Sequence, residues 1–163
     1  MAEDQVQRIH ELLSEFDTAM LITHGEDFAH ARPMAIAAVE PNCDVWFFTG
    51  RSTPKVQEIH NDQSVLIVCQ DEHRRYVSLS GRAELVADRP KARQLWNDSY
   101  KTWFPESADD PDLLLICVHA DEAEYWDTRG TKGLHHLFKA ARARIRGTRP
   151  EIKEGEQHGK VGL

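Results

Sequence analysis

The chain has 163 residues, of which 40% are hydrophobic and 29% are charged, and its formal net charge at pH 7 is -7. This length predicts one domain, and the negative charge argues against general coating of nucleic acid, because a field of that sign repels phosphate. The sequence has no apolar run of about 18 residues that could span a bilayer, and its start lacks the features of a secretory signal. The three cysteines form no close pair and fit a reducing compartment. We therefore expect a cytoplasmic protein with no membrane or nucleic-acid partner.

Charge is distributed unevenly along the chain. Residues 1–127 carry 11 basic and 24 acidic side chains, a net of -13, whereas residues 128–163 carry 9 basic and 3 acidic ones, a net of +6. We expect the basic end to pack on the acidic body of its own chain or of a partner subunit. A nucleic-acid tail is the less favoured interpretation, because no aromatic residues interleave with the basic ones.

The first third of the chain predicts one helix and three strands. Apolar residues at helical spacing indicate a helix over residues 5–16. Strands are expected over 19–23 and 30–39, and Pro33 moves the start of the second strand to an edge or a bulge, because proline donates no ladder hydrogen bond. Residues 45–49 are apolar on both alternating faces, which is typical of a strand that is covered on both sides.

A short helix over residues 56–60 follows, with Thr53 as its N-cap and Pro54 in its first turn. Asp88 is expected to cap a later helix that begins near Pro90 and ends near Tyr100. A loop over 101–112 comes next. The remaining expected elements are strands over 64–69, 75–86 (with a bulge at Gly81), 113–119 and 123–127, a final helix over 133–146, and a polar tail without a core pattern over 148–163.

Six or seven strands with short helices between them do not alternate as a doubly wound sheet requires. They predict an α+β, mainly β protein: an antiparallel barrel with short peripheral helices. We expect one barrel domain over residues 1–147 and a polar C-terminal tail over 148–163.

The best candidate for a ligand site lies where a strand leads into the helix after Pro54. The hydroxyls of Ser52 and Thr53, the free N–H groups of the helix start and the Lys55 ammonium converge there, and such groups favour a phosphate. The alternative is an ordinary capped helix with an exposed lysine. Neither a P-loop nor a glycine-rich dinucleotide motif occurs.

Three further residues could contact a flat ligand. Arg32 begins a run of mostly small apolar residues against which a planar group could lie, although it could equally be a surface arginine. Trp103 and Trp126 could stack on such a ligand or fill the core and an interface.

Metal binding and side-chain catalysis have weaker support. Cys117 and His119 share one strand face, but two ligands do not make a site, so no metal site is expected. No motif identifies a nucleophile with its base, and no catalytic residue can be named.

Taken together and in order, these segments resemble the general stress protein 26 family, within the pyridoxamine 5'-phosphate oxidase-like FMN-binding split barrels. The resemblance extends over roughly residues 5–130. It rests on Ala31-Arg32-Pro33-Met34, Trp46-Phe47-Phe48-Thr49, Ser52-Thr53-Pro54-Lys55, Tyr76-Val77-Ser78-Leu79-Ser80-Gly81, Trp103-Phe104-Pro105 and Glu124-Tyr125-Trp126-Asp127.

The resemblance implies a six-stranded split barrel that forms a homodimer with two FMN molecules in clefts at the subunit interface. It places the isoalloxazine along Arg32-Pro33-Met34 and Phe48-Thr49, and it implies flavin contacts from Tyr76 of a partner subunit, Trp126 and Trp103. The phosphate is expected near Arg32, Ser52, Thr53 and Lys55, which agrees with the candidate site derived from the residues. FAD is the alternative flavin.

One segment departs from the oxidases themselves. Where they carry Arg-Leu-His-Asp-Arg to hold the substrate phosphate, residues 133–137 read Gly-Leu-His-His-Leu, which cannot make bidentate phosphate contacts. We therefore expect no oxidation of pyridoxamine phosphate. The leading hypothesis is an FMN-dependent oxidoreductase or flavin reductase that exchanges electrons with NAD(P)H or another small molecule. The alternative is a non-catalytic flavin-binding, storage or sensing stress protein, and a haem protein would rest only on nine scattered histidines.

Overall fold

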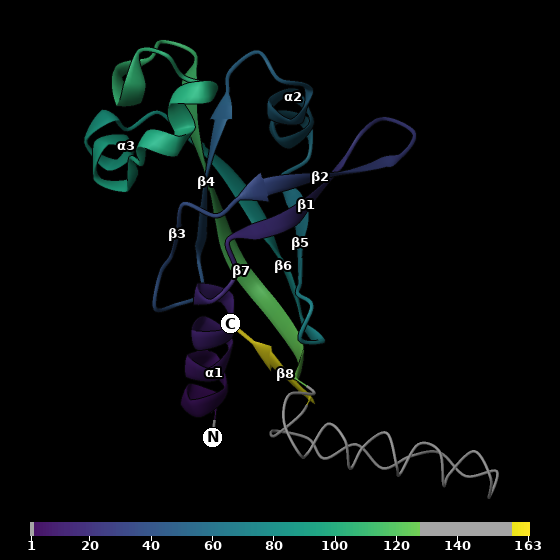
Figure 1. Cartoon of the computed structure of the whole chain (residues 1–163). Helices are drawn as coiled ribbons and strands as arrows, with labels where there is room; N and C mark the ends of the chain where they lie inside the picture. Colours follow the sequence, from purple (N-terminus) through teal and green to yellow (C-terminus); the bar gives the residue numbers. More distant parts are fainter. Residues whose placement is uncertain (1, 128–157) are drawn as a thin grey trace, which may run out of the picture.

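The computed structural model describes residues 2–127 and 158–163 (Figure 1). The final helix expected over 133–146, the segment 133–137 and the expected domain boundary at 147 lie outside the described residues. The helices are α1 (Ala2–Ser14), α2 (Pro54–Asn61) and α3 (Arg89–Leu95), with short 3-10 helices η1 (Asp98–Thr102) and η2 (Ser107–Asp109). The strands are β1 (Thr18–His24), β2 (Ala29–Ala35), β3 (Ala38–Val39), β4 (Val45–Gly50), β5 (Ser64–Gln70), β6 (Arg75–Val86), β7 (Leu113–Asp127) and β8 (His158–Gly162).

One antiparallel sheet contains all of these strands, in the order β2-β1-β5-β6-β7-β4-β3, with β8 paired to β7. Strands β2 and β3 lie at opposite ends of this order, yet only Ile36 and Ala37 separate them in the chain. The N–H of Ile36 donates to Asp17 next to β1, and the N–H of Ala37 donates to Trp46 on β4. The sheet must therefore curl until its two ends meet, which confirms the expected split barrel.

The described residues form eight strands, whereas six or seven were expected: one expected strand is divided, two are joined, and β8 was not expected. The strand expected over 30–39 is divided into β2 and β3 where the chain passes from one end of the sheet to the other. The two strands expected over 113–127 form the single strand β7. Its pairing with β6 is continuous, and the irregularity between Ser80 and Gly81 only shifts the register of that pairing. The bulge predicted at Gly81 is thus confirmed. A Cβ at Gly81 would lie 2.1 Å from the carbonyl oxygen of His119, so only glycine permits this close approach of β6 and β7.

The prediction that residues 148–163 lack a core pattern is wrong for the end of the chain. Strand β8 pairs with β7, and Val161 is buried in the main core at 8% exposure. Gly159 packs so closely against Tyr125 that a Cβ would lie 2.6 Å from its ring. Val161 is the only bulky apolar residue of β8 that faces inward. An alternation of apolar and polar residues this short does not predict a strand.

The expected helices are present, but their bounds differ: α1 spans Ala2–Ser14 instead of residues 5–16, whereas α3 begins close to Pro90 as expected. The Asp88 side chain accepts a hydrogen bond from the N–H of Lys91, as expected of an N-cap. Helix α3 stops at Leu95 instead of near Tyr100, because the Asn97 side chain caps a separate 3-10 helix, η1. Thr53 occupies the N-cap position of α2, but its side chain makes no cap bond and donates instead to the carbonyl of Gly50.

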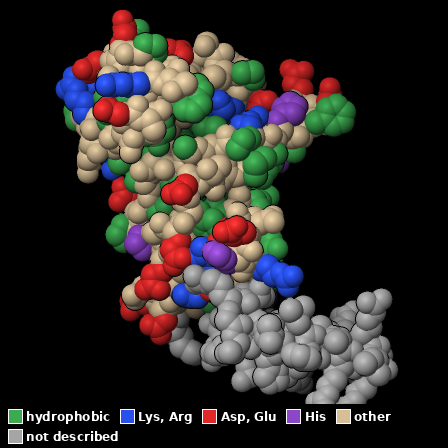
Figure 2. Space-filling view, in the orientation of Figure 1, with side chains coloured by type: hydrophobic (Ala, Val, Ile, Leu, Met, Phe, Trp, Pro, Cys, Tyr) green, Lys and Arg blue, Asp and Glu red, His purple; other side chains and the backbone are tan. Residues whose placement is uncertain are grey.

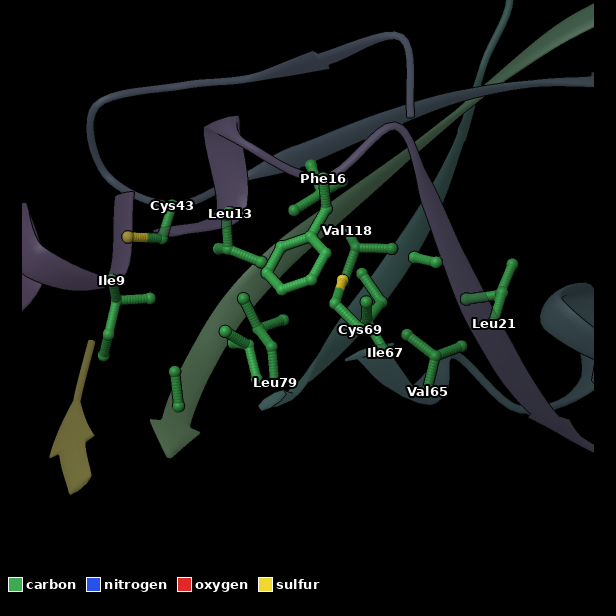
Figure 3. Close-up of a cluster of buried hydrophobic side chains, with 14 of the residues drawn as sticks. Ile9, Leu13, Phe16, Leu21, Cys43, Val65, Ile67, Cys69, Leu79 and Val118 are labelled. Atoms are coloured by element: carbon green, nitrogen blue, oxygen red, sulfur yellow. The ribbon is translucent and has the colours of Figure 1, made fainter. Parts of the chain in front are cut away.

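The main core lies inside the curl of the sheet, where α1 covers it with its apolar face. Figure 3 shows the ring of Phe16 directed among Cys69, Leu79 and Val118. A second apolar cluster, built around Phe48, Phe104 and Leu115, packs β4 and β7 against α3 and η1. Because both faces are covered there, residues 113–118 of β7 are buried without alternation. Among the described residues, no helix is long and apolar enough to cross a membrane.

Candidate functional site

A cavity of about 530 Å3 opens between β2, the end of β4, the start of α2 and the η1 segment. Strand β2 runs at one end of the sheet and β4 near the other, so the curl of the sheet brings them together at this place (Figure 1). Fourteen residues line the cavity: Thr18, Arg32, Pro33, Met34, Ala35, Phe48, Thr49, Gly50, Thr53, Lys55, Tyr100, Trp103, Phe104 and Asp112. The structure thus brings eight of the eleven predicted site residues to one cavity.

The polar end of the cavity is built around Lys55. Its Nζ donates to Thr49 Oγ1 at 3.2 Å, and Thr49 Oγ1 lies 3.2 Å from Thr53 Oγ1. Burial lowers the pKa of Lys55 below its ordinary value, and the neighbouring charge of Arg32 lowers that pKa further, against an opposing effect of Glu58. No carboxylate among the residues that the structure describes forms an ion pair with Lys55. An anion at this point would stabilise the ammonium and would find two hydroxyl groups within reach.

Arg32 also lines the cavity, but its guanidinium is already paired. Its Nη2 lies 3.0 Å from Glu58 Oε2 and its Nη1 donates to Thr23 Oγ1 at 2.5 Å, while Thr23 itself donates to Glu58. His30 Nδ1 lies 2.6 Å from the other carboxylate oxygen of Glu58. The hydrogen bond from Thr23, followed by those from His30 and Arg32, lowers the pKa of Glu58 to about 2 despite its burial. Glu58 therefore holds a negative charge beside Arg32 at all ordinary pH values.

The remaining walls are apolar and aromatic. Pro33 and Met34 come from β2, and Phe48 comes from β4. The Phe48 ring lies 4.6 Å from the Tyr100 ring, centroid to centroid, which joins the strand to the η1 segment. Trp103 follows η1 and is 71% exposed, an unusual exposure for so large an apolar side chain. A flat apolar slot next to a cationic end suits a ligand with a planar ring and an anionic group.

Three of the predicted residues do not line this cavity. The Ser52 hydroxyl points to Asp112 Oδ1, at 3.5 Å, and Asp112 is a cavity residue. Tyr76 and Trp126 are direct neighbours across β6 and β7, and Trp126 stacks on His158 of β8 with ring centroids 5.2 Å apart. Within the chain, this pair lies in a different part of the sheet from the cavity.

Sequence reasoning missed several residues of the site. Glu58 and Thr23 both accept hydrogen bonds from Arg32. Asp112 adds a carboxylate to the lining of the cavity. One signal was available: Lys55 and Glu58 are three residues apart on a helix and so share one of its faces. Asp112 lies so close to Gly50 that a Cβ there would be 2.5 Å from Asp112 Oδ2, and no local pattern predicts this approach.

A second cavity, of about 600 Å3, lies between α2 and the hairpin that joins β1 and β2. Hydrophobic, acidic and histidine side chains lie together on this projecting hairpin at the right of Figure 2. The walls of this second cavity include His24, Glu26, Asp27 and Asp62. The concentration of carboxylates makes it a poor place for a phosphate.

A family model described as pyridoxamine 5'-phosphate oxidase like matches residues 4–151. Among curated proteins, none matches the chain.

Solved structures share the fold. A structure described as general stress protein 26 from Jannaschia sp. CCS1 superposes with a TM-score of 0.73 at 22% identity, and the match covers 100% of both chains. General stress protein 26 from Bacillus anthracis str. Sterne has a TM-score of 0.67 at 23% identity, over 77% of this chain and 94% of its own. The general stress FMN/FAD binding protein from Xanthomonas citri has a TM-score of 0.68 at 25% identity, over 78% of this chain and 92% of its own.

Proposed function

Because the chain belongs to the pyridoxamine 5'-phosphate oxidase like family, we propose that it is a flavin-binding stress protein of the cytoplasm with its flavin in the Lys55 cavity. The relative from Xanthomonas citri is described as binding FMN or FAD, which supports a flavin as the ligand class. The observation that carries the proposal is the half-buried ammonium of Lys55, which has no ion-pair partner among the described residues and faces an apolar slot.

The residues present fit FMN. Its phosphate needs a cation and a hydrogen-bond donor, which Lys55 and the Thr49 hydroxyl offer at one end of the cavity. Its ring system needs a flat apolar surface, which Met34 and Phe48 offer. The cavity volume of about 530 Å3 is in the range of roughly 300–1,000 Å3 that is usual for small-molecule sites. We propose FMN in preference to FAD, because Lys55 offers a site for one terminal phosphate group.

Bound flavin would supply electron-transfer chemistry that no side chain of this cavity offers. The protein's part is to bind, orient and shield. Lys55 would neutralise the anionic end, the Thr49 hydroxyl would donate a hydrogen bond to it, and Phe48 would shield the ring side from water. The Arg32–Glu58 pair fixes the edge of β2 against α2.

We further propose that the protein is an oxidoreductase that exchanges electrons with NAD(P)H or another small molecule, and that it does not oxidise pyridoxamine phosphate. It would act as a homodimer. The cavity is open at Trp103, and Tyr76 and Trp126 lie elsewhere in the protomer, so these two residues would reach a flavin only from a partner subunit.

The test is a titration of the apoprotein with FMN, FAD and riboflavin, followed by fluorescence. Tight FMN binding with much weaker riboflavin binding supports a phosphate-binding site at Lys55. If none of the three binds, the proposal is wrong. Holoprotein is then mixed with NADH and NADPH: bleaching of bound flavin faster than of free FMN supports an oxidoreductase, and the absence of bleaching favours storage or sensing.

A further inference from the structure

A second group of side chains able to bind a ligand lies on the sheet, away from the cavity. Asp44 directly precedes β4, and Cys117 and His119 lie on β7. In the β4–β7 register Val45 pairs with Val118, which brings Asp44 opposite His119. Cys117 and His119 are two residues apart on one strand and so share one face of the sheet. The fold thus adds a third ligand, 73 residues before Cys117, to the two that were evident in the sequence.

The three donor atoms converge. His119 Nδ1 lies 2.9 Å from Asp44 Oδ2 and 3.9 Å from Cys117 Sγ, and all three donor atoms are within 4.8 Å of one another. In a tetrahedral zinc site, sulfur and nitrogen ligands are about 3.6 Å apart, given bonds of about 2.3 and 2.0–2.1 Å. The observed separation of sulfur and nitrogen is close to that value.

We propose that Asp44, Cys117 and His119 form a binding site for a divalent transition metal, with Zn2+ as the preferred ion. A set of one thiolate, one imidazole and one carboxylate suits zinc, whereas magnesium and calcium require oxygen ligands. The three protein ligands leave a fourth position for water or another small ligand. When the metal binds, the Cys117 thiol loses its proton to solvent. None of the three residues lines the flavin cavity, so the site is independent of the proposed flavin function.

The neighbours of the three ligands are arranged as in known metal sites. Glu84 Oε2 lies 2.8 Å from His119 Nε2, so that Nε2 donates a proton to the carboxylate and Nδ1 presents its lone pair to the metal. Asp44 Oδ1 accepts a hydrogen bond from the N–H of Ala120 at 3.1 Å, which leaves Oδ2 for the ion. A carboxylate behind the ligating histidine is a common means of fixing its tautomer and orientation.

The site is held in place and has access to solvent. The N–H of Glu40 donates to the carbonyl of Asp44, and the Asp44 N–H donates to Asn42 Oδ1, so the turn before β4 is fixed by its own hydrogen bonds. Cys117 is 2% exposed, whereas the His119 side chain is 44% exposed. An ion can therefore enter from the histidine side and bind a thiolate that is shielded from oxidants.

The test uses the full chain, reduced and treated with a chelator, in two titrations. Zn2+ titrated by calorimetry is expected to bind with one equivalent at this site. Co2+ is expected to give the near-ultraviolet charge-transfer absorption of a cobalt–thiolate bond. Failure of Zn2+ to bind, or Co2+ binding without the thiolate absorption, would overturn the proposal.

Variants assign the site. Cys117→Ser is expected to abolish the cobalt–thiolate absorption, whereas Cys69→Ser, which alters another buried free cysteine on β5, keeps it. If Cys117→Ser does not fold, His119→Gln and Asp44→Asn test the less buried ligands and are expected to weaken Zn2+ binding at least about tenfold. Glu84→Gln is expected to weaken it about 10- to 100-fold while the thiolate absorption remains. Unchanged Zn2+ affinity in the ligand variants would place the ion elsewhere and refute the site.

Discussion

Arg32 and Glu58 form an ion pair of 3.0 Å between β2 and α2, at the edge of the cavity. The glutamate is only 13% exposed and also accepts hydrogen bonds from Thr23 and His30. Glu58 neutralises the charge of Arg32, which is one of the two cations expected to bind a phosphate. Lys55 is therefore expected to be the principal anion-binding group, and Arg32 is expected to contribute less.

This relationship predicts the effect of removing the carboxylate charge. Glu58→Gln keeps a similar shape but ends the neutralisation of Arg32, so the cavity becomes more positive. FMN is expected to bind about two- to tenfold more tightly, an effect of roughly 0.5–1.4 kcal/mol that is typical of a partly solvated charge. Riboflavin, which lacks the phosphate, should bind as before. Weaker FMN binding, with the fold intact by circular dichroism, would mean that Glu58 orients Arg32 toward the phosphate.

Stability should depend on pH through the same carboxylate. The pKa of Glu58 is about 2 in the folded protein and lies below its ordinary value of 4.5. A lowered pKa in the folded state stabilises the protein fully above the ordinary value, and this stabilisation is lost as pH falls toward the folded value. The wild type should therefore lose free energy of unfolding between about pH 4.5 and pH 2.

Urea denaturation of the wild type and of Glu58→Gln across this pH range measures the contribution. The difference in free energy of unfolding between the two proteins should be largest near neutral pH and should shrink as pH falls. Glu72→Gln, at an exposed carboxylate, serves as the control and should show no such trend. A constant difference for Glu58→Gln would contradict the assignment.

Trp103 should contribute to binding of the ring and not to binding of the phosphate. It is 71% exposed at the rim of the cavity, so Trp103→Ala should change the free energy of unfolding by less than about 0.5 kcal/mol. Loss of an aromatic contact worth roughly 0.5–1.5 kcal/mol should weaken FMN and riboflavin by the same factor, about two- to tenfold. Parallel fluorescence titrations check this, and a loss confined to FMN would contradict it.

The bulge at Gly81 should be essential for folding. Gly81→Ala would place a Cβ 2.1 Å from the His119 carbonyl oxygen, a backbone atom that cannot move aside. We expect the free energy of unfolding to fall by about 2 kcal/mol or more, measured by urea denaturation. Gly162→Ala is a matched control on β8, because a Cβ there has no atom within 4 Å, and it should be nearly neutral.

The sequence predicted the elements whose signal is local. The alternation over 75–86, the Gly81 bulge and the Asp88 cap depend on neighbouring residues, and the structure has each of them where it was expected. Thr53 holds the expected N-cap position, but its side chain makes no cap bond. The break between β2 and β3 could not be predicted in this way, because it arises where the curled sheet closes. Strand β8 exists because β7 offers it a partner.

In the candidate sites too, the residues that could be predicted are neighbours in the sequence, and the others come together only in the fold. Residues 48–55 are contiguous, and their convergence on one cavity could be expected from a strand that leads into a helix. Glu58 with Arg32, and Asp44 with His119, meet only through tertiary pairing across 26 and 75 residues. No local pattern reports such distances. A resemblance to a family can suggest a flavin, but it gives no indication of the Asp44, Cys117 and His119 cluster, which lies away from the cavity.

The most direct test of the central claim is the ratio of riboflavin to FMN dissociation constants, measured in the wild type and in Lys55→Ala. Loss of a charge-assisted contact worth roughly 1.5–3 kcal/mol should weaken FMN about 10- to 100-fold and leave riboflavin unchanged. Lys160→Ala, an exposed lysine on β8, provides the control and should leave both constants as they are. The ratio is expected to fall toward one in Lys55→Ala, and an unchanged ratio would contradict a phosphate-binding site at Lys55.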